Sequence, residues 1–171
     1  HDELRRLFAE MHLFSQQVQD FLTLQLWTCT RGGEICQMSA GQITRETDGV
    51  WWTIRKEDTK VRHHESASDL RVPLVGRALE VVERLLQAHG SEDEGEWLFP
   101  SRRRDGSAWH VEQPYMQSKV HYRQPYSKAR PDHVRDRLTV THWSPHDLRR
   151  TGRTMLAALG CPEEVGEAIL G

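Results

Sequence analysis

The sequence has few cysteines, no long apolar run and no excess of positive charge. Its 171 residues include three cysteines, Cys29, Cys36 and Cys161, and none of them belongs to a Cys-x-x-Cys pair. Their apolar surroundings favour buried free thiols over a disulfide framework or metal ligands. The apolar runs are too short to span a bilayer, and the pattern of a signal peptide is missing. These absences predict a cytoplasmic protein with no membrane partner.

The formal net charge of -2 argues against a uniformly basic nucleic-acid binder. The charge is nevertheless unevenly placed. Residues 1–100 hold 11 Lys and Arg against 17 Asp and Glu, whereas residues 101–171 hold 12 against 8. A surface that attracts phosphate could therefore be local.

Apolar residues make up 37% of the chain and recur in regular blocks, which predicts a folded protein rather than a disordered one. The length fits one domain over residues 1–171. The chain begins with His1 and ends on Gly171 within an apolar helical pattern. We therefore expect both ends to be cuts through a longer protein.

The order of periodic segments predicts an α+β fold, mainly helical, with helices packed around a small three-stranded antiparallel sheet. A surface helix and a buried helix come first. The Gly-containing link 47–49 predicts a hairpin of two strands, and Pro73 places a third strand at a sheet edge or marks a strand end. Between residues 101 and 143 only 111–122 is expected to be helical. The segments assigned in this way are helices at 4–11, 18–27 and 79–86, and strands at 43–46, 50–55 and 70–74.

A helix is predicted to begin at Ser144, which is followed by Pro145 and, three residues after the cap, by Asp147. Leu148, Gly152, Met155 and Leu159 then fall on one apolar stripe.

His146, Arg149 and Arg153 share another face of this helix, which we expect to point away from the core. Because His146 would lie in the first turn, unpaired backbone N–H groups there would attract an anion such as phosphate. Most His-x-x-Arg patterns, however, mark only a solvated basic face.

The His-x-x-Arg pattern is the last of three motifs that follow one another along the chain, and this order favours a functional site over a solvated face. They are Thr30-Arg31-Gly32-Gly33-Glu34 after the buried helix, Thr59-Lys60 beyond the hairpin, and His146-Asp147-Leu148-Arg149-Arg150-Thr151 at the capped helix. This series resembles the catalytic domain of the tyrosine recombinase, or phage integrase, family. The resemblance runs from about Phe21 to Gly171 and includes the segments 70–74, 97–100 and 159–171.

The resemblance implies a site for the scissile phosphate of DNA. Arg31 and Arg149 would clamp its non-bridging oxygens through forked hydrogen bonds. Lys60 would be the general acid that protonates the leaving 5′ oxygen, although Lys56 and Arg62 lie in the same loop. His146 would assist proton transfer or hold the phosphate, and Glu34 would be a structural brace for Arg31.

Arg62, Arg103 and Arg153 are candidate DNA contacts, with a solvated basic surface as the alternative. The histidine pairs 63–64 and 142/146 lack a carboxylate or thiol at convincing spacing, so we expect neither a metal site nor a cofactor. Double-stranded DNA is the implied partner. Family members act as homo-tetramers on paired DNA sites, whereas an isolated catalytic fragment could be a monomer.

In the family, a tyrosine that follows these motifs attacks the phosphorus and forms a 3′-phosphotyrosyl bond. Tyr115, Tyr122 and Tyr126 all precede His146. We therefore expect a catalytic-domain fragment that lacks its nucleophile and the preceding DNA-binding domain, and that does not cleave DNA by itself. One alternative is a non-catalytic DNA-binding module that retains the recombinase fold. Another is an unrelated helical protein, in which the four catalytic candidates would lie scattered.

Overall fold

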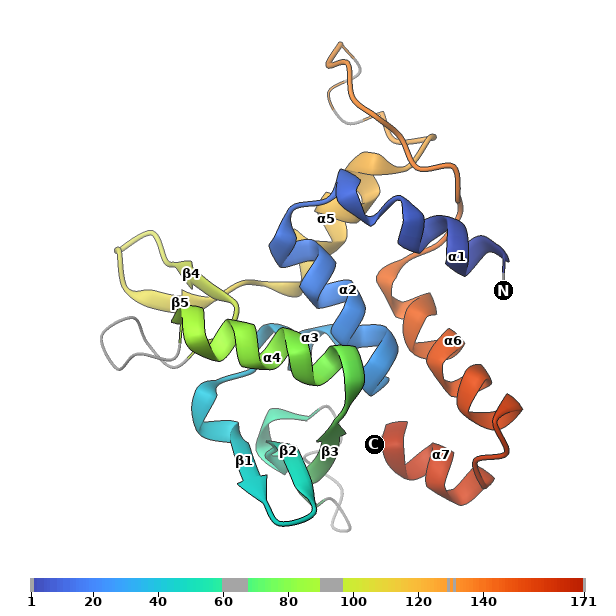
Figure 1. Ribbon diagram of the computed structural model, residues 1–171. Helices are drawn as coiled ribbons and strands as arrows, with labels where there is room; N and C mark the ends of the chain where they lie inside the picture. Colours follow the sequence, from blue (N-terminus) through green and yellow to red (C-terminus); the bar gives the residue numbers. More distant parts are fainter. Residues whose placement is uncertain (1, 60–67, 90–96, 129, 131, 171) are drawn as a thin grey trace.

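The computed structural model describes residues 2–59, 68–89, 97–128, 130 and 132–170. Its central element is α2 (Gln16–Thr28), against which α3, α4, α5, α6 and β3 pack (Figure 1). Phe21, Leu22 and Leu24 on α2 are fully buried. A helix with apolar residues on several faces can be covered on several sides, which explains the central position of α2. The other helices are α1 (Asp2–Ala9), α3 (Gly32–Cys36), α4 (Gly76–His89), α5 (Gln113–Arg123), α6 (Pro145–Ala158) and α7 (Glu163–Leu170), with the short 3-10 turns η1 (Met11–Leu13), η2 (Ala40–Gln42) and η3 (Lys56–Asp58).

The main sheet contains β1 (Ile43–Glu46), β2 (Gly49–Ile54) and β3 (Leu70–Leu74) in the order β1-β2-β3, and both pairings are antiparallel. Trp52 on the middle strand is fully buried and pairs with Val72. Pro73 pairs with Trp51 in an edge strand, where a residue without an N–H is tolerated. The predicted hairpin, the edge strand and the mainly helical α+β class are confirmed.

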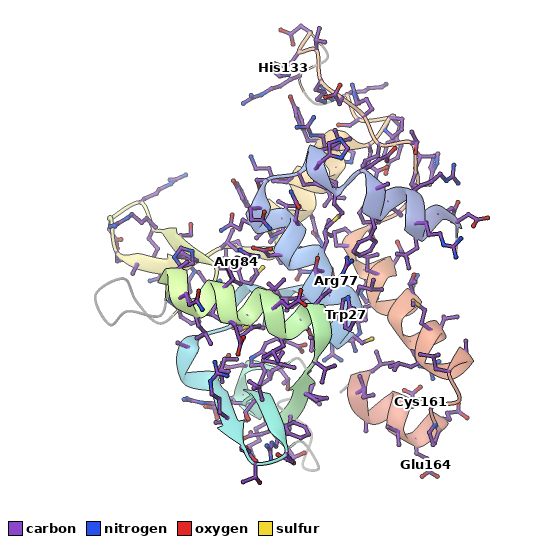
Figure 2. All side chains as sticks on the ribbon, in the orientation of Figure 1. Trp27, Arg77, Arg84, His133, Cys161 and Glu164 are labelled. Atoms are coloured by element: carbon purple, nitrogen blue, oxygen red, sulfur yellow. The ribbon has the colours of Figure 1, made fainter. Side chains whose placement is uncertain are left out.

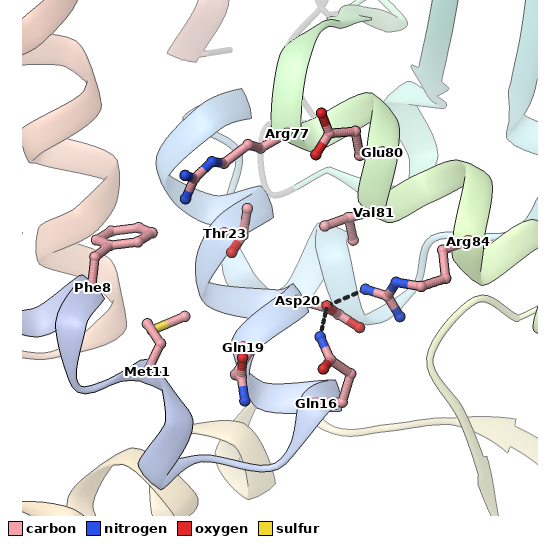
Figure 3. Close-up of a pocket in the computed structure, with 10 residues that line it drawn as sticks. All are labelled: Phe8, Met11, Gln16, Gln19, Asp20, Thr23, Arg77, Glu80, Val81 and Arg84. Atoms are coloured by element: carbon pink, nitrogen blue, oxygen red, sulfur yellow. Dashed lines mark hydrogen bonds and ion pairs between the residues drawn. The ribbon is translucent and has the colours of Figure 1, made fainter.

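A buried carboxylate joins α2 to α4. Asp20 is 2% exposed, and its Oδ1 accepts hydrogen bonds from Arg84 Nη2 at 2.5 Å and from Gln16 Nε2 at 2.9 Å (Figure 3). These groups lie on the wall of a cavity of about 480 Å³ that α2 and α4 line together with Phe8 and Met11. A buried charge is tolerated when it is paired in this way.

A second hairpin was not predicted. It consists of β4 (Pro100–Arg102) and β5 (Ala108–His110), within a stretch for which only a helix was expected. At its turn Gly106 has a φ of +84° and donates its N–H to the carbonyl of Arg103 at 2.9 Å. Asp105-Gly106 is a turn signal, but the flanking strands are only three residues long and show no alternation that would predict a hairpin.

Residues 124–143, which we call the arm, connect α5 to α6 and project from the body of the molecule (Figure 1). His133 lies near the outer end of the arm (Figure 2). Leu138 and Val140 are buried and return the arm to the core. The backbone N–H of Thr139 also donates to the carboxylate of Glu10, at 3.0 Å from its Oε2. No helix of the described ranges combines the length and the apolar character needed to cross a membrane.

Candidate active site

Arg31 is held where α2 ends and α3 begins. Cys29 ends α2 in the left-handed conformation with a φ of 55°, and the hydroxyls of Thr28 and Thr30 lie 2.7 Å apart across the turn. The backbone N–H of Arg31 donates to Glu34 Oε2 at 2.7 Å, while its Nη1 donates to Glu34 Oε1 at 3.0 Å. The expected pairing is therefore present. Because Glu34 is 6% exposed, the guanidinium of Arg31 is braced by a buried carboxylate.

The start of α6 is fixed by the predicted cap. The N–H and the hydroxyl of Ser144 both donate to Asp147 Oδ2 at 2.9 Å, and Pro145 occupies the first turn. Partial burial would raise the pKa of Asp147, but the two bonds from Ser144 and the charge of Arg150 hold that pKa below its ordinary value. The sequence of the cap thus sets the residue at which α6 begins.

Gly152 lets α6 approach the end of α2 closely. A Cβ atom at this position would lie 2.5 Å from Cys29 Sγ and 2.7 Å from the carbonyl oxygen of Leu26. Both distances are shorter than real Cβ contacts. Arg149 lies almost one turn before this contact and Arg31 lies two residues after Cys29, so the close approach brings the two arginines into the same region.

Arg149 is 8% exposed, which is unusual for an arginine. Its Nη2 donates to the carbonyl of Leu170 at 2.5 Å, whereas its buried Nη1 has no hydrogen-bond partner among the described residues. Burial lowers the pKa of Arg149, and the positive charge of Arg31 lowers it further, against the opposing effects of Glu34 and Cys29. These interactions place Arg31 and Glu34 within electrostatic reach of Arg149.

The expectation that the basic face of α6 points away from the core is wrong for Arg149. α7 packs back against α6, so its last carbonyl meets Arg149, and Glu167 pairs with Arg153. On the supposed apolar stripe, Leu148 is buried but Leu159 is 83% exposed. A helix between two neighbours buries more than one face, which the periodicity of a single helix does not reveal.

His146 is exposed in the first turn of α6, three residues before Arg149. It therefore lies on the same side of the helix as Arg149 but nearer to solvent. Arg153, a candidate DNA contact, is half-buried and forms an ion pair with Glu167.

Of the other candidates, the structure describes Arg103 but neither Lys60 nor Arg62. Lys60 and Arg62 fall outside the described residues, in the connection between β2 and β3, and their positions stay predictions. Before them, Thr59 is buried, and its hydroxyl donates to the carbonyl of Lys56 at 2.8 Å. Arg103 lies in the β4–β5 turn, with its guanidinium 3.5 Å from the centre of the Trp109 ring.

No group of three or more His, Cys, Asp or Glu residues in the described part of the chain could hold a metal ion. All three cysteines are free. Burial, with a smaller effect of Glu112, raises the pKa of Cys36 to about 12, so this thiol is neutral and inert.

The region between α2 and α6 is suited to an anion. It contains two guanidinium groups within electrostatic reach of one buried carboxylate, and a buried N–H group of Arg149 has no acceptor in the ranges that the structure describes. A buried donor without a partner is costly, and like charges repel, so a bound oxyanion would relieve both effects. Sequence reasoning identified the two arginines, but it missed Gly152 as the residue that brings them together.

The fold is thus an α+β domain in which two arginines lie within electrostatic reach of one buried carboxylate. The model of the phage integrase family matches residues 1–171, so the chain belongs to this family. A comparison with curated protein sequences gave no match.

Solved structures of recombinases share the fold. The XerH recombinase bound to its difH substrate has a TM-score of 0.65 at 17% identity, over 100% of this chain and 46% of that one. XerA recombinase gives 0.67 at 17% identity, over 100% and 54%. The lambda integrase catalytic core gives 0.65 at 14% identity, over 99% and 88%. The chain therefore spans about half the length of the longer recombinases, and membership of the family excludes an unrelated helical protein with chance motifs.

Proposed function

We propose that the protein containing these residues is a site-specific DNA recombinase, and that residues 1–171 are its catalytic domain without the nucleophile. The observation that carries the proposal is the buried guanidinium of Arg149, with one N–H group that finds no acceptor among the described residues, within electrostatic reach of Arg31. Forked donors of this kind match the non-bridging oxygens of a phosphodiester. The substrate is double-stranded DNA, and the full-length protein acts as a homo-tetramer on paired sites.

In the proposed reaction a tyrosine oxygen attacks the phosphorus, and the bond from phosphorus to the 5′ oxygen breaks. Arg31 and Arg149 stabilise the negative charge of the transition state, and His146 holds the phosphate or assists proton transfer. Lys60 gives its proton to the 5′ oxygen, because an alkoxide is a poor leaving group. The phosphotyrosyl bond retains the energy of the phosphodiester, so the reaction needs neither a metal ion nor ATP.

The nucleophile is proposed to follow residue 171. The carbonyl of Leu170 contacts Arg149, so a chain that continues from α7 starts beside the anion site. Each of the three tyrosines within the chain contacts another residue: the Tyr122 hydroxyl lies 2.8 Å from His133 Nδ1, the ring of Tyr126 stacks on His142, and the ammonium of Lys119 lies over the ring of Tyr115. Residues 1–171 alone are therefore proposed to bind DNA without cleaving it.

Covalent capture of DNA by the full-length protein tests the proposal. The protein is incubated with DNA that contains its recombination site, and protein-linked DNA is measured on a denaturing gel. Arg149→Ala should abolish the linked species. Arg150→Ala is the matched control, because its exposed side chain lies next along the same helix, and this variant should still capture DNA. Undiminished capture by Arg149→Ala would contradict the assignment, and a wild-type protein that binds DNA without capture would favour the non-catalytic binding module.

A further inference from the structure

The outer part of the arm has an interior made of arginine side chains, whereas the apolar Leu138 and Val140 are buried where the arm returns to the core. Arg135 donates to the backbone carbonyls of Tyr122, Ser127, Arg130 and His133, at distances from 2.8 to 3.3 Å. A single guanidinium therefore holds both sides of the arm together. Planar guanidinium groups with five N–H donors can bond several carbonyls at once.

A second guanidinium group, that of Arg137, also bonds backbone carbonyls of the arm. Arg137 Nη1 donates to the carbonyls of Gln124 at 2.6 Å, Ser127 at 3.0 Å and Pro125 at 3.3 Å. Arg135 and Arg137 bond neutral carbonyls, and no carboxylate in the described part of the chain forms an ion pair with either of them. Residues 124–143 contain four Lys and Arg residues against two Asp, so the arm is positively charged although the whole chain is not.

The base of the arm is held closed directly before the start of α6. Gln124 is 1% exposed, and its side-chain N–H donates to the carbonyl of Trp143, the residue before the Ser144 cap of α6. The rings of Tyr126 and His142 stack across the two strands of the base, with centroids 5.0 Å apart. The arm therefore emerges in a fixed direction directly before the helix that carries His146 and Arg149.

We propose that the arm is a preformed contact for the phosphate backbone of duplex DNA, with Lys128 and Arg130 as the residues that meet phosphates of the duplex held by Arg31 and Arg149. Both side chains are exposed, and both lie on the arm that the arginine interior holds open. A duplex carries one negative charge per about 1.7 Å of its axis, so DNA bound at the anion site presents further phosphates close by.

This inference rests on the proposed function, because it requires DNA at the anion site. It adds a surface that the catalytic motifs do not include. Neighbouring phosphates carry no sequence information, so the arm would increase affinity and fix the position of the duplex rather than select a sequence.

The salt dependence of DNA binding tests the arm. A fluorescent duplex of about two helical turns is titrated with residues 1–171 at several salt concentrations. Lys128→Ala/Arg130→Ala should reduce the slope of log K against log salt by about 1.8, since each phosphate contact contributes about 0.9. The matched control is Arg45→Ala/Arg71→Ala, which removes two positive charges from the sheet, at the opposite end of the molecule (Figure 1). Its slope should equal that of the wild type.

The outcomes separate the two proposals. Salt-dependent binding by the wild type with the same slope in the arm variant overturns the arm contact and leaves the proposed function standing. Absence of duplex binding by the wild type counts against the proposed function itself. The arm variant could also keep the slope of log K against log salt and show altered self-association in sedimentation. This result would indicate that the arm contacts a second copy of the chain, and it would overturn the DNA contact.

Discussion

At the scale of single residues, the position of Arg149 depends on Gly152, which has no functional side chain but allows α6 to approach α2 closely. We predict that Gly152→Ala lowers the free energy of unfolding by about 1–3 kcal/mol, the usual cost of forcing an extra carbon into a packed interface. The added carbon would meet Cys29 Sγ and the carbonyl of Leu26, and the backbone atom cannot move aside as a flexible side chain could. Urea unfolding followed by circular dichroism measures the change.

Gly166 is the matched control for this substitution. It is also buried and helical, but nothing lies within 4 Å of a Cβ added there. Gly166→Ala should leave stability unchanged or raise it, because alanine favours a helix by up to about 1 kcal/mol. An equal decrease in the free energy of unfolding for both variants would show that the close contact between α6 and α2 at Gly152 does not contribute to stability.

The residues of the anion site were predictable because their signal is local. Arg31 and Glu34 are three apart at a helix start, and the Ser144-Pro145 cap fixes the first turn in which His146 lies. The burial of Arg149 was not predictable in the same way. It results from α7 folding back, and no pattern within α6 contains that information.

At the scale of elements, the start of α6 should respond to acid. Because the folded-state pKa of Asp147 is lowered, its bonds to Ser144 stabilise the fold at any pH above the unfolded value of about 3.9. This stabilisation is lost as the pH falls through the lower folded-state pKa. Urea unfolding should therefore show that the free energy of unfolding of the wild-type protein falls between about pH 5 and pH 2. The fall should be smaller for Asp147→Asn. Identical pH profiles for the two proteins would contradict this role of the cap.

The elements differ in how far their own residues determine them. The β1–β2 hairpin and the edge strand β3 followed from alternation, a Gly-containing link and Pro73. The arm did not, because its order comes from Arg135 and Arg137 bonding carbonyls five or more residues away in most cases, and such bonds leave no periodic pattern. The short β4–β5 hairpin had only the Asp105-Gly106 signal.

At the scale of the whole molecule, positive charge is not in excess but is concentrated in one region. The chain is negative in total, yet Arg31, Arg149 and the arm gather positive charge around the start of α6. A local field of this kind can attract DNA without a basic protein surface elsewhere. Composition alone would have argued against DNA binding, and only the order of the motifs indicated it.

The most direct measurement of the central claim is a double-mutant cycle on duplex binding by residues 1–171. If Arg31 and Arg149 hold one phosphate, Arg31→Ala and Arg149→Ala together should lose less affinity than the sum of the single losses, with a coupling of about 0.5–3 kcal/mol. A control cycle pairs Arg31→Ala with Arg103→Ala, which lies on the β4–β5 turn, and should be additive. Additivity of Arg31 and Arg149 to within about 0.5 kcal/mol would contradict a shared phosphate.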